Sequence, residues 1–111
     1  MGDGGFLFTG QELATARKYG LNVIVLLFND EEYRAIRYVQ ERDFAGRVID
    51  AELCNPDFLA YARAFGCDAV RLAEPDALAQ AVRGALRLER PTVIELPISV
   101  RCPAWAPASD A

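Results

Sequence analysis

The chain has 111 residues, of which 52% are hydrophobic and 25% are charged, as expected for one small folded domain. Its 16 acidic residues outnumber its 12 basic ones. A nucleic-acid partner is therefore not expected, because phosphate neutralisation needs clustered Lys and Arg. Histidine is absent, which excludes a His-based nucleophilic dyad and a His-ligated zinc site within the chain.

The predicted elements alternate helices with short β-branched strands, which is typical of an α/β domain with a parallel sheet. We expect a first helix over residues 9–19, with Thr9 as its N-cap. The apolar, β-branched residues that follow Asn22 then predict a strand over residues 22–28, buried on both faces. A second helix is expected over residues 31–41, and the polar segment 42–54 is expected to be loop.

The second half of the chain continues this alternation. A helix is expected over residues 55–66, with Asn55 as its N-cap and proline at its first position. A short strand over residues 69–72, a helix that opens at residues 74–76 and a last strand over residues 92–96 follow. The side chains expected to face the core from the two helices are Phe58, Ala62, Phe65, Leu78, Val82, Ala85 and Leu86.

These elements together predict a partial three-layer α/β domain, in which three parallel strands are flanked by helices. No strand is predicted before Gly2. The domain is expected over residues 1–97, and residues 98–111 are expected to form an extended or disordered tail.

Two motifs carry candidate chemistry. Gly2-Asp3-Gly4-Gly5 opens the chain, and Asn29-Asp30 follows the first predicted strand after the spacer of residues 5–28. A carboxylate flanked by glycines lets the backbone approach a phosphate while the side chain reaches a metal. Asp30 can add a second oxygen ligand, because ligands of α/β sheets gather at the carboxyl ends of strands. The two motifs thus predict a site for a Mg2+-bridged diphosphate.

Each motif taken alone has a purely structural explanation. The glycines could form only a flexible N-terminus, and Asp30 could only cap the helix predicted after it. A dinucleotide fingerprint is not supported, because Leu7 stands where that motif requires glycine. The charged residues of the predicted helix are expected to form a solvated face: Glu31, Glu32, Arg34 and Arg37.

The spacing of Gly2-Asp3-Gly4 and Asn29-Asp30 resembles the thiamine-diphosphate motif, in which GDG is followed at a similar distance by NN or ND. Residues 2–37, the sequence NPDFLAYARAFG and the closing RPTVIEL also look like one particular domain. It is the C-terminal diphosphate-binding domain of acetolactate-synthase-like and 2-oxo acid decarboxylase-like enzymes. The resemblance implies thiamine diphosphate and Mg2+ as cofactors, and a carboligase or decarboxylase acting on a 2-oxo acid.

Carried over onto this chain, the resemblance implies Asp3 and Asp30 as side-chain ligands of Mg2+ and the backbone carbonyl of Glu32 as a further ligand. Family members often have small residues where Glu31 and Arg34 stand here. Extra negative charge at this place would favour Mg2+ but oppose an anionic diphosphate.

The resemblance also implies direct contacts with the cofactor. Gly4 and Gly5 would give amide contacts to the diphosphate, Asn29 would support the turn, and Tyr33 stands where the family has residues near the thiazolium. Phe8 is a second candidate of that kind. The implied cofactor-binding residues are thus Gly2, Asp3, Gly4, Gly5, Asn29, Asp30, Glu32 and Tyr33.

No catalytic residue is implied within the chain itself. In the family the cofactor lies between two domains, and the second domain binds the aminopyrimidine and supplies the activating glutamate. Nothing in this chain resembles that domain, so a pyrimidine-binding domain or subunit is the expected partner, and a homo-oligomer is an option. Three hypotheses stay open: part of an enzyme truncated at its N-terminus, a partner-dependent subunit of a split enzyme, and a non-catalytic remnant.

The remaining features predict the compartment. Cys54, Cys67 and Cys102 lack the spacing of a metal or redox motif, so reduced thiols are expected. The longest apolar run, residues 23–28, is too short to span a bilayer, and we recognise no signal peptide or myristoylation pattern. We therefore expect a cytoplasmic protein without a membrane partner.

Overall fold

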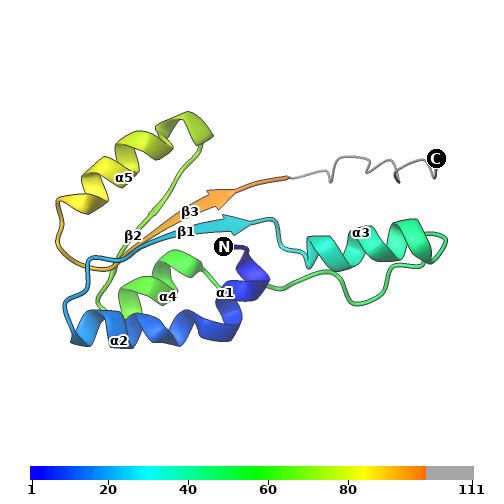
Figure 1. The fold of residues 1–111 in the computed structure, drawn as a ribbon, viewed down its shortest axis with the longest axis horizontal. Coiled ribbons are helices and arrows are strands. Elements are labelled where there is room, and N and C mark those ends of the chain that lie inside the picture. The colour runs from blue at the N-terminus through cyan, green and yellow to red at the C-terminus, as the bar shows by residue number, and fades with distance from the viewer. Residues whose placement is uncertain (100–111) are drawn as a thin grey trace, which may run out of the picture.

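The structure, a computed structural model, describes residues 1–99. A parallel sheet of three strands forms its centre (Figure 1), composed of β1 (Ile24–Asn29), β2 (Asp68–Arg71) and β3 (Thr92–Pro97). The strands lie in the order β1-β3-β2, so the last strand along the chain is the central one. The predicted α/β fold with a parallel sheet is confirmed.

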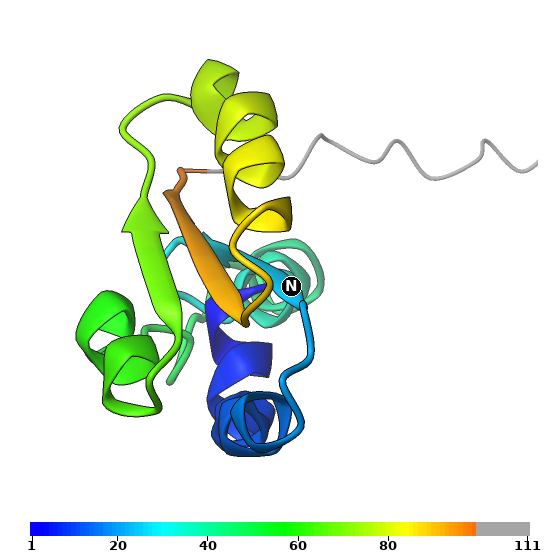
Figure 2. The same cartoon turned by 90° about the vertical axis from the view of Figure 1, so that its left-hand side faces the viewer.

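Helices cover both faces of the sheet, as Figure 2 shows. α5 (Leu78–Leu86) lies on one face, and α1 (Asp3–Thr9), α2 (Leu13–Lys18) and α4 (Phe58–Ala64) lie on the other. Because successive strand residues point to opposite faces, the neighbours Val93 and Ile94 of the central strand belong to different cores, and both are fully buried. The expected layers of helix, sheet and helix are therefore present.

Aromatic rings build the core on the side of α1 and α4. Phe58 is 0% exposed, and its ring meets Phe6 of α1 edge to face, with the ring centroids 5.6 Å apart. Ala62 is also fully buried, and Phe65 packs against the same cluster. These contacts confirm the prediction that Phe58, Ala62 and Phe65 face the core.

The core under α5 is smaller. Leu78, Val82 and Ala85 pack against the sheet, as predicted, but Leu86 is 56% exposed. The prediction for Leu86 is wrong because consecutive helical residues are about 100° apart, so Ala85 and Leu86 cannot both point at the sheet. A 3-10 turn, η2 (Pro75–Ala77), leads into this helix.

The first helix begins at Asp3, with Gly2 as its N-cap, and Thr9 is its last residue rather than its N-cap. The amide of Phe6 donates to the Gly2 carbonyl at 2.9 Å, and burial of the Phe6 side chain stabilises this turn. A 3-10 turn, η1 (Gly10–Glu12), joins α1 to α2. The glycine motif is therefore the first turn of a helix and not a loop before one.

The helix after β1, α3 (Arg34–Asp43), begins three residues later than expected. Glu31 has a φ of 56°, a left-handed conformation that cannot start a helix. The Tyr33 amide donates to the Ala51 carbonyl and the Leu53 amide donates to the Glu31 carbonyl, both at 2.7 Å. The segment predicted as loop thus contributes an extended stretch that fixes this turn.

The N-cap of α4 is Asp57, not Asn55. One carboxylate oxygen of Asp57 accepts hydrogen bonds from the amides of Ala60 and Leu59, which lowers the pKa of this carboxyl group. The side chain of Asn55 is instead directed to the site described below.

Both ends of the described chain form hydrogen bonds with the end of β1. The Met1 carbonyl accepts from the Phe28 amide at 2.9 Å, and Gly2 forms a parallel bridge with Phe28. The Ile98 amide donates to the Asn29 carbonyl at 2.8 Å. The tail predicted over residues 98–111 lies, from residue 100 onward, outside the described residues.

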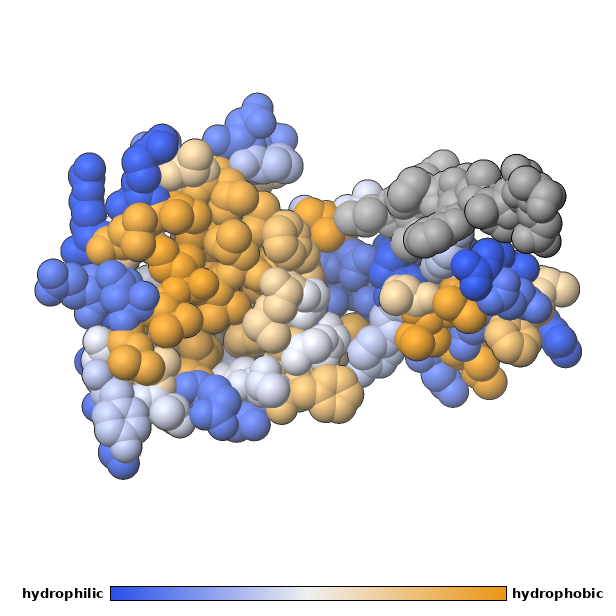
Figure 3. Space-filling view, viewed as in Figure 1, coloured by the Kyte–Doolittle hydropathy of each residue, from blue (hydrophilic) through white to orange (hydrophobic). Residues whose placement is uncertain are grey.

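Apolar side chains gather over the sheet beside α5 (Figure 3). Along the outer edge of β1, Met1, Leu21 and Val23 are 49%, 45% and 40% exposed and line a cavity of about 380 Å3 against α2. Over residues 1–99, no helix is long and apolar enough to cross a membrane.

Candidate functional site

A cavity of about 370 Å3 opens where the carboxyl end of β1 meets the first turns of α1 and α3. Of the residues assigned to the cofactor from the sequence, it brings together Gly2, Asp3, Gly4, Gly5, Asp30, Glu32 and Tyr33. Asn29 is not part of the lining and lies in a hydrogen-bond network next to it. Phe8 is 73% exposed and does not line the cavity.

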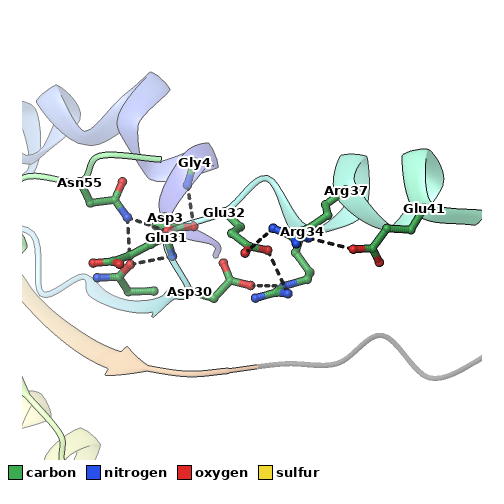
Figure 4. Close-up of polar contacts among 10 residues, drawn as sticks. Asp3, Gly4, Asp30, Glu31, Glu32, Arg34, Arg37, Glu41 and Asn55 are labelled. Carbon is green, nitrogen blue, oxygen red and sulfur yellow. Dashed lines mark hydrogen bonds and ion pairs between the residues drawn. The ribbon is translucent and has the colours of Figure 1, made fainter. Parts of the chain in front are cut away.

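Asp3 is only 2% exposed, and three hydrogen bonds hold its carboxylate in a single orientation. One carboxylate oxygen accepts from the Gly4 amide at 2.9 Å. The other accepts from the Glu31 amide at 2.9 Å and from Nδ2 of Asn55 at 2.7 Å (Figure 4). These contacts connect the start of α1, the turn after β1 and the segment before α4.

A chain of side-chain hydrogen bonds supports Asp3 from the sheet. Nδ2 of Asn55 also donates to Oδ1 of Asn29 at 2.9 Å. Nδ2 of Asn29 donates to Oε1 of Glu95 at 2.7 Å, and Glu95, on the central strand, is 1% exposed. Nε of Arg71 donates to the other oxygen of Glu95 at 2.8 Å, which raises the pKa of Arg71. Glu95 thereby fixes which atom of the Asn29 amide faces Asn55.

The carboxylate of Asp30 forms an ion pair with Arg34. Nε of Arg34 donates to Oδ2 of Asp30 at 2.8 Å, and this hydrogen bond raises the pKa of Arg34. Nη1 of Arg34 lies 2.9 Å from Oε2 of Glu32, and Nη1 of Arg37 lies 3.0 Å from Oε1 of Glu32. Two arginines therefore offset the negative charge that would oppose an anionic diphosphate.

The predicted solvated face of Glu31, Glu32, Arg34 and Arg37 is wrong in one respect. Glu31 and Glu32 precede α3, because the pairing with residues 51–53 holds them in extended and left-handed backbone. The side chain of Glu32 is only 18% exposed and lies between the two arginines. Glu32 and Arg34 line the cavity, whereas Glu31 and Arg37 are not part of its lining.

The backbone around Glu32 leaves its carbonyl out of the pairing with residues 51–53. The bonds of that bridge use the carbonyl of Glu31 and the amide of Tyr33, on either side of Glu32. The backbone groups of a residue at such a non-hydrogen-bonded position point away from the partner strand. The Glu32 carbonyl is therefore available to a ligand outside this bridge.

The donors at the cavity fit a magnesium-bound diphosphate. Asp3 and Asp30 offer carboxylate oxygens and Glu32 a carbonyl oxygen, all hard donors of the kind that Mg2+ takes while phosphate and water complete its shell. Within the described residues, no three or more acidic, cysteine or histidine side chains are grouped to hold a metal by themselves. At Gly2 and Gly5 a Cβ would meet no atom within 4 Å, so the space beside both backbones is open.

Gly4, in contrast, is covered by Tyr33. A Cβ at Gly4 would lie 2.5 Å from Cε1 and 2.8 Å from Cδ1 of the Tyr33 ring, and 3.3 Å from Leu53. Gly4→Ala is therefore expected to displace the ring and to lower the free energy of unfolding by about 1–2 kcal/mol, measured by urea denaturation. Gly5→Ala is the matched control, since the added methyl group meets open space in the same helical turn. An equal loss of stability in both variants would contradict the close approach of Tyr33.

Three residues of the site were missed from the sequence. Asn55 was assigned to a helix cap, although Asp57 two residues later is an equally good cap and leaves Asn55 to a second role. Glu95 is a charged residue inside the apolar strand TVIEL, which was a usable signal. For Arg34 the sequence offered only its (i, i+4) spacing from Asp30.

A family model described as the thiamine pyrophosphate enzyme, C-terminal TPP binding domain, matches residues 1–96. The chain is 33% identical to an acetolactate synthase of Bacillus subtilis over 87% of its own length and 17% of the relative's. It is 35% identical to an acetolactate synthase large subunit of Parasynechococcus marenigrum, over 86% of the chain and 16% of the relative. The chain thus spans about a sixth of these relatives.

The chain is also similar to solved structures of thiamine-diphosphate-dependent enzymes. The benzoylformate decarboxylase from Polynucleobacter necessarius superposes with a TM-score of 0.82 at 29% identity, over 89% of this chain and 19% of that one. From the motif, the fold and these matches together, the chain belongs to the C-terminal TPP-binding domain family of thiamine pyrophosphate enzymes, among acetolactate-synthase-like and decarboxylase-like members.

Proposed function

We propose that the chain binds the Mg2+-diphosphate end of thiamine diphosphate as part of a carboligase or decarboxylase that acts on a 2-oxo acid. One observation carries the proposal: the carboxylates of Asp3 and Asp30 line one cavity beside Glu32, in a chain whose residues 1–96 match the family. The names of the relatives, acetolactate synthase and benzoylformate decarboxylase, support the class of reaction.

In this proposal each residue has a binding or orienting task. Asp3, Asp30 and the carbonyl of Glu32 hold Mg2+, and the amide of Gly5 contacts the diphosphate. The Gly4 amide, expected from the sequence to do the same, donates to Asp3 and orients that carboxylate. Asn29 and Asn55 keep the Asp3 carboxylate oriented through their hydrogen bonds. Tyr33 covers Gly4 and forms the wall toward the thiazolium. When bound, the cofactor supplies the nucleophile and electron sink for cleavage or formation of a carbon–carbon bond.

We further propose that a pyrimidine-binding domain or subunit completes the site. The exposed apolar surface of α3 supports this, since no residue of α3 is buried and Ile36, which lines the cavity, is 54% exposed. A homo-oligomer and a cytoplasmic location stay predictions.

Calorimetry with thiamine diphosphate tests the proposal. The chain is expected to bind the cofactor in the presence of Mg2+ and not in the presence of EDTA. Asp30→Ala is expected to abolish the Mg2+-dependent binding, because it removes a metal ligand. Asp43→Ala is the control, since Asp43 pairs with Arg42 at the far end of α3 and is not part of the cavity lining.

Two other outcomes separate the hypotheses. Binding that appears only after a pyrimidine-binding partner is added would identify a partner-dependent subunit. Unchanged affinity in Asp30→Ala would refute its role, and no binding with or without such a partner would leave the non-catalytic remnant as the explanation.

A further inference from the structure

A guanidinium group is bound to one of the carboxylates that are proposed to hold the metal. Nε of Arg34 is 2.8 Å from Oδ2 of Asp30 and its Nη1 is 2.9 Å from Oε2 of Glu32, so one cation joins both carboxylates (Figure 4). The side chains of Asp30 and Glu32 are only 9% and 18% exposed. Carboxylates so far removed from water need a positive partner, and Arg34 provides it.

Coordination of Mg2+ by Asp30 conflicts with the ion pair between Asp30 and Arg34. The metal binds carboxylate oxygens at about 2.0–2.1 Å in a nearly octahedral shell. A guanidinium at hydrogen-bond distance from the same carboxylate then lies beside a doubly charged ion, and the two repel each other. Arg34 is also part of the cavity lining, next to the carboxylate that the metal would bind.

From this geometry we infer that Arg34 is an internal counter-cation of Asp30, which a divalent metal must displace in order to bind. The inference rests on the proposed function, because it assumes that Asp30 is a metal ligand. Arg34 therefore lowers the affinity of the chain for divalent metal and stabilises the metal-free site. After displacement Arg34 keeps Glu32 as its partner and stays at the cavity wall.

Arg37 provides the matched control. It pairs with the same Glu32, at 3.0 Å, and with Glu41, at 2.9 Å. Arg34→Gln and Arg37→Gln remove the same charge from the same helix, and only the first variant removes the cation on Asp30. Neither change threatens folding of the core, since α3 has no buried residue.

The test is a titration of the whole chain with Mn2+ alone, in which free Mn2+ is followed by electron paramagnetic resonance. Arg34→Gln is expected to bind Mn2+ about tenfold more tightly than wild type, whereas Arg37→Gln should change the affinity about twofold or less. The double variant Asp30→Ala/Arg34→Gln should lose the gain. Thermal melts give a second readout: in EDTA, Arg34→Gln should melt at a lower temperature than wild type, and Mn2+ should raise its melting temperature more than that of wild type.

The failures of the two proposals differ. Equal or weaker Mn2+ binding by Arg34→Gln, in a chain that still binds thiamine diphosphate with Mg2+, would overturn the inference and leave the proposed function in place. Weaker binding would make Arg34 an orienting partner of Asp30. If neither wild type nor Arg34→Gln binds Mn2+ or thiamine diphosphate, with or without a pyrimidine-binding partner, the proposed function fails, and this inference fails with it.

Discussion

Replacement of Phe58 by alanine is expected to lower the free energy of unfolding by about 3–5 kcal/mol, a large part of the stability of a small domain. The side chain is 0% exposed and packs edge to face on Phe6 of α1, with 5.6 Å between the ring centroids. Its removal leaves a cavity between α4, α1 and the sheet that the fixed strands cannot close. Urea denaturation followed by circular dichroism measures the loss.

Phe8→Ala is the control for this substitution. The same atoms are removed from α1, but Phe8 is 73% exposed, so the expected change is about 0.5 kcal/mol or less. Comparable losses in the two variants would show that the rings of Phe58 and Phe6 do not form the core described above.

Glu95→Gln is expected to lower the free energy of unfolding by about 2–3 kcal/mol, although it changes only one atom of the side chain. Both oxygens of Glu95 accept hydrogen bonds, one from Asn29 at 2.7 Å and the other from Arg71 at 2.8 Å. A carboxamide replaces one acceptor with a donor, so two donors must face each other in a site that is 1% exposed. The Asn29 amide then loses the contact that fixes its orientation toward Asn55.

Glu41→Gln makes the same chemical change at the surface. Glu41 pairs with Arg37 one helical turn away and its side chain is 51% exposed, so a change within about 0.5 kcal/mol is expected. If Glu95→Gln proved as stable as Glu41→Gln, the network from Glu95 to Asp3 would be dispensable for folding.

The sequence predicted the strands well and the helix starts poorly, for a physical reason. An apolar, β-branched run such as residues 23–28 locates a strand from its local pattern alone. The predicted burial of this strand on both faces is wrong, because β1 is at the edge of the described sheet and Phe28 is 37% exposed. The start of α3 depends on Glu31, whose left-handed backbone is fixed by residues 51–53 and by the Asp3 carboxylate. Such contacts between residues distant in sequence cannot be predicted from the local pattern of apolar and polar residues.

The residues of the candidate site also differ in how far the sequence could predict them. Asp3 and Asp30 could be paired from the sequence because the end of a buried strand and a glycine motif meet at one edge of an α/β sheet. Asn55 and Glu95 could not be placed, since their partners are distant in sequence: Asn55 bonds to Asp3, and Glu95 to Asn29. A charged residue in an apolar strand was the one local sign that something polar had to lie beside it.

The central position of β3 determines when the site can form during synthesis. Residues 3, 29 and 55 leave the ribosome well before Glu95, so the first three members of the network exist without their anchor until the final strand emerges. Until then β1 and β2 are not joined, because within residues 1–99 both of these strands pair with β3 and not with each other. Sheets that depend on such distant pairings fold slowly, and their apolar strands stay exposed in the meantime. A ribosome that stalls before residue 92 would hold a chain with helices and motifs but no sheet.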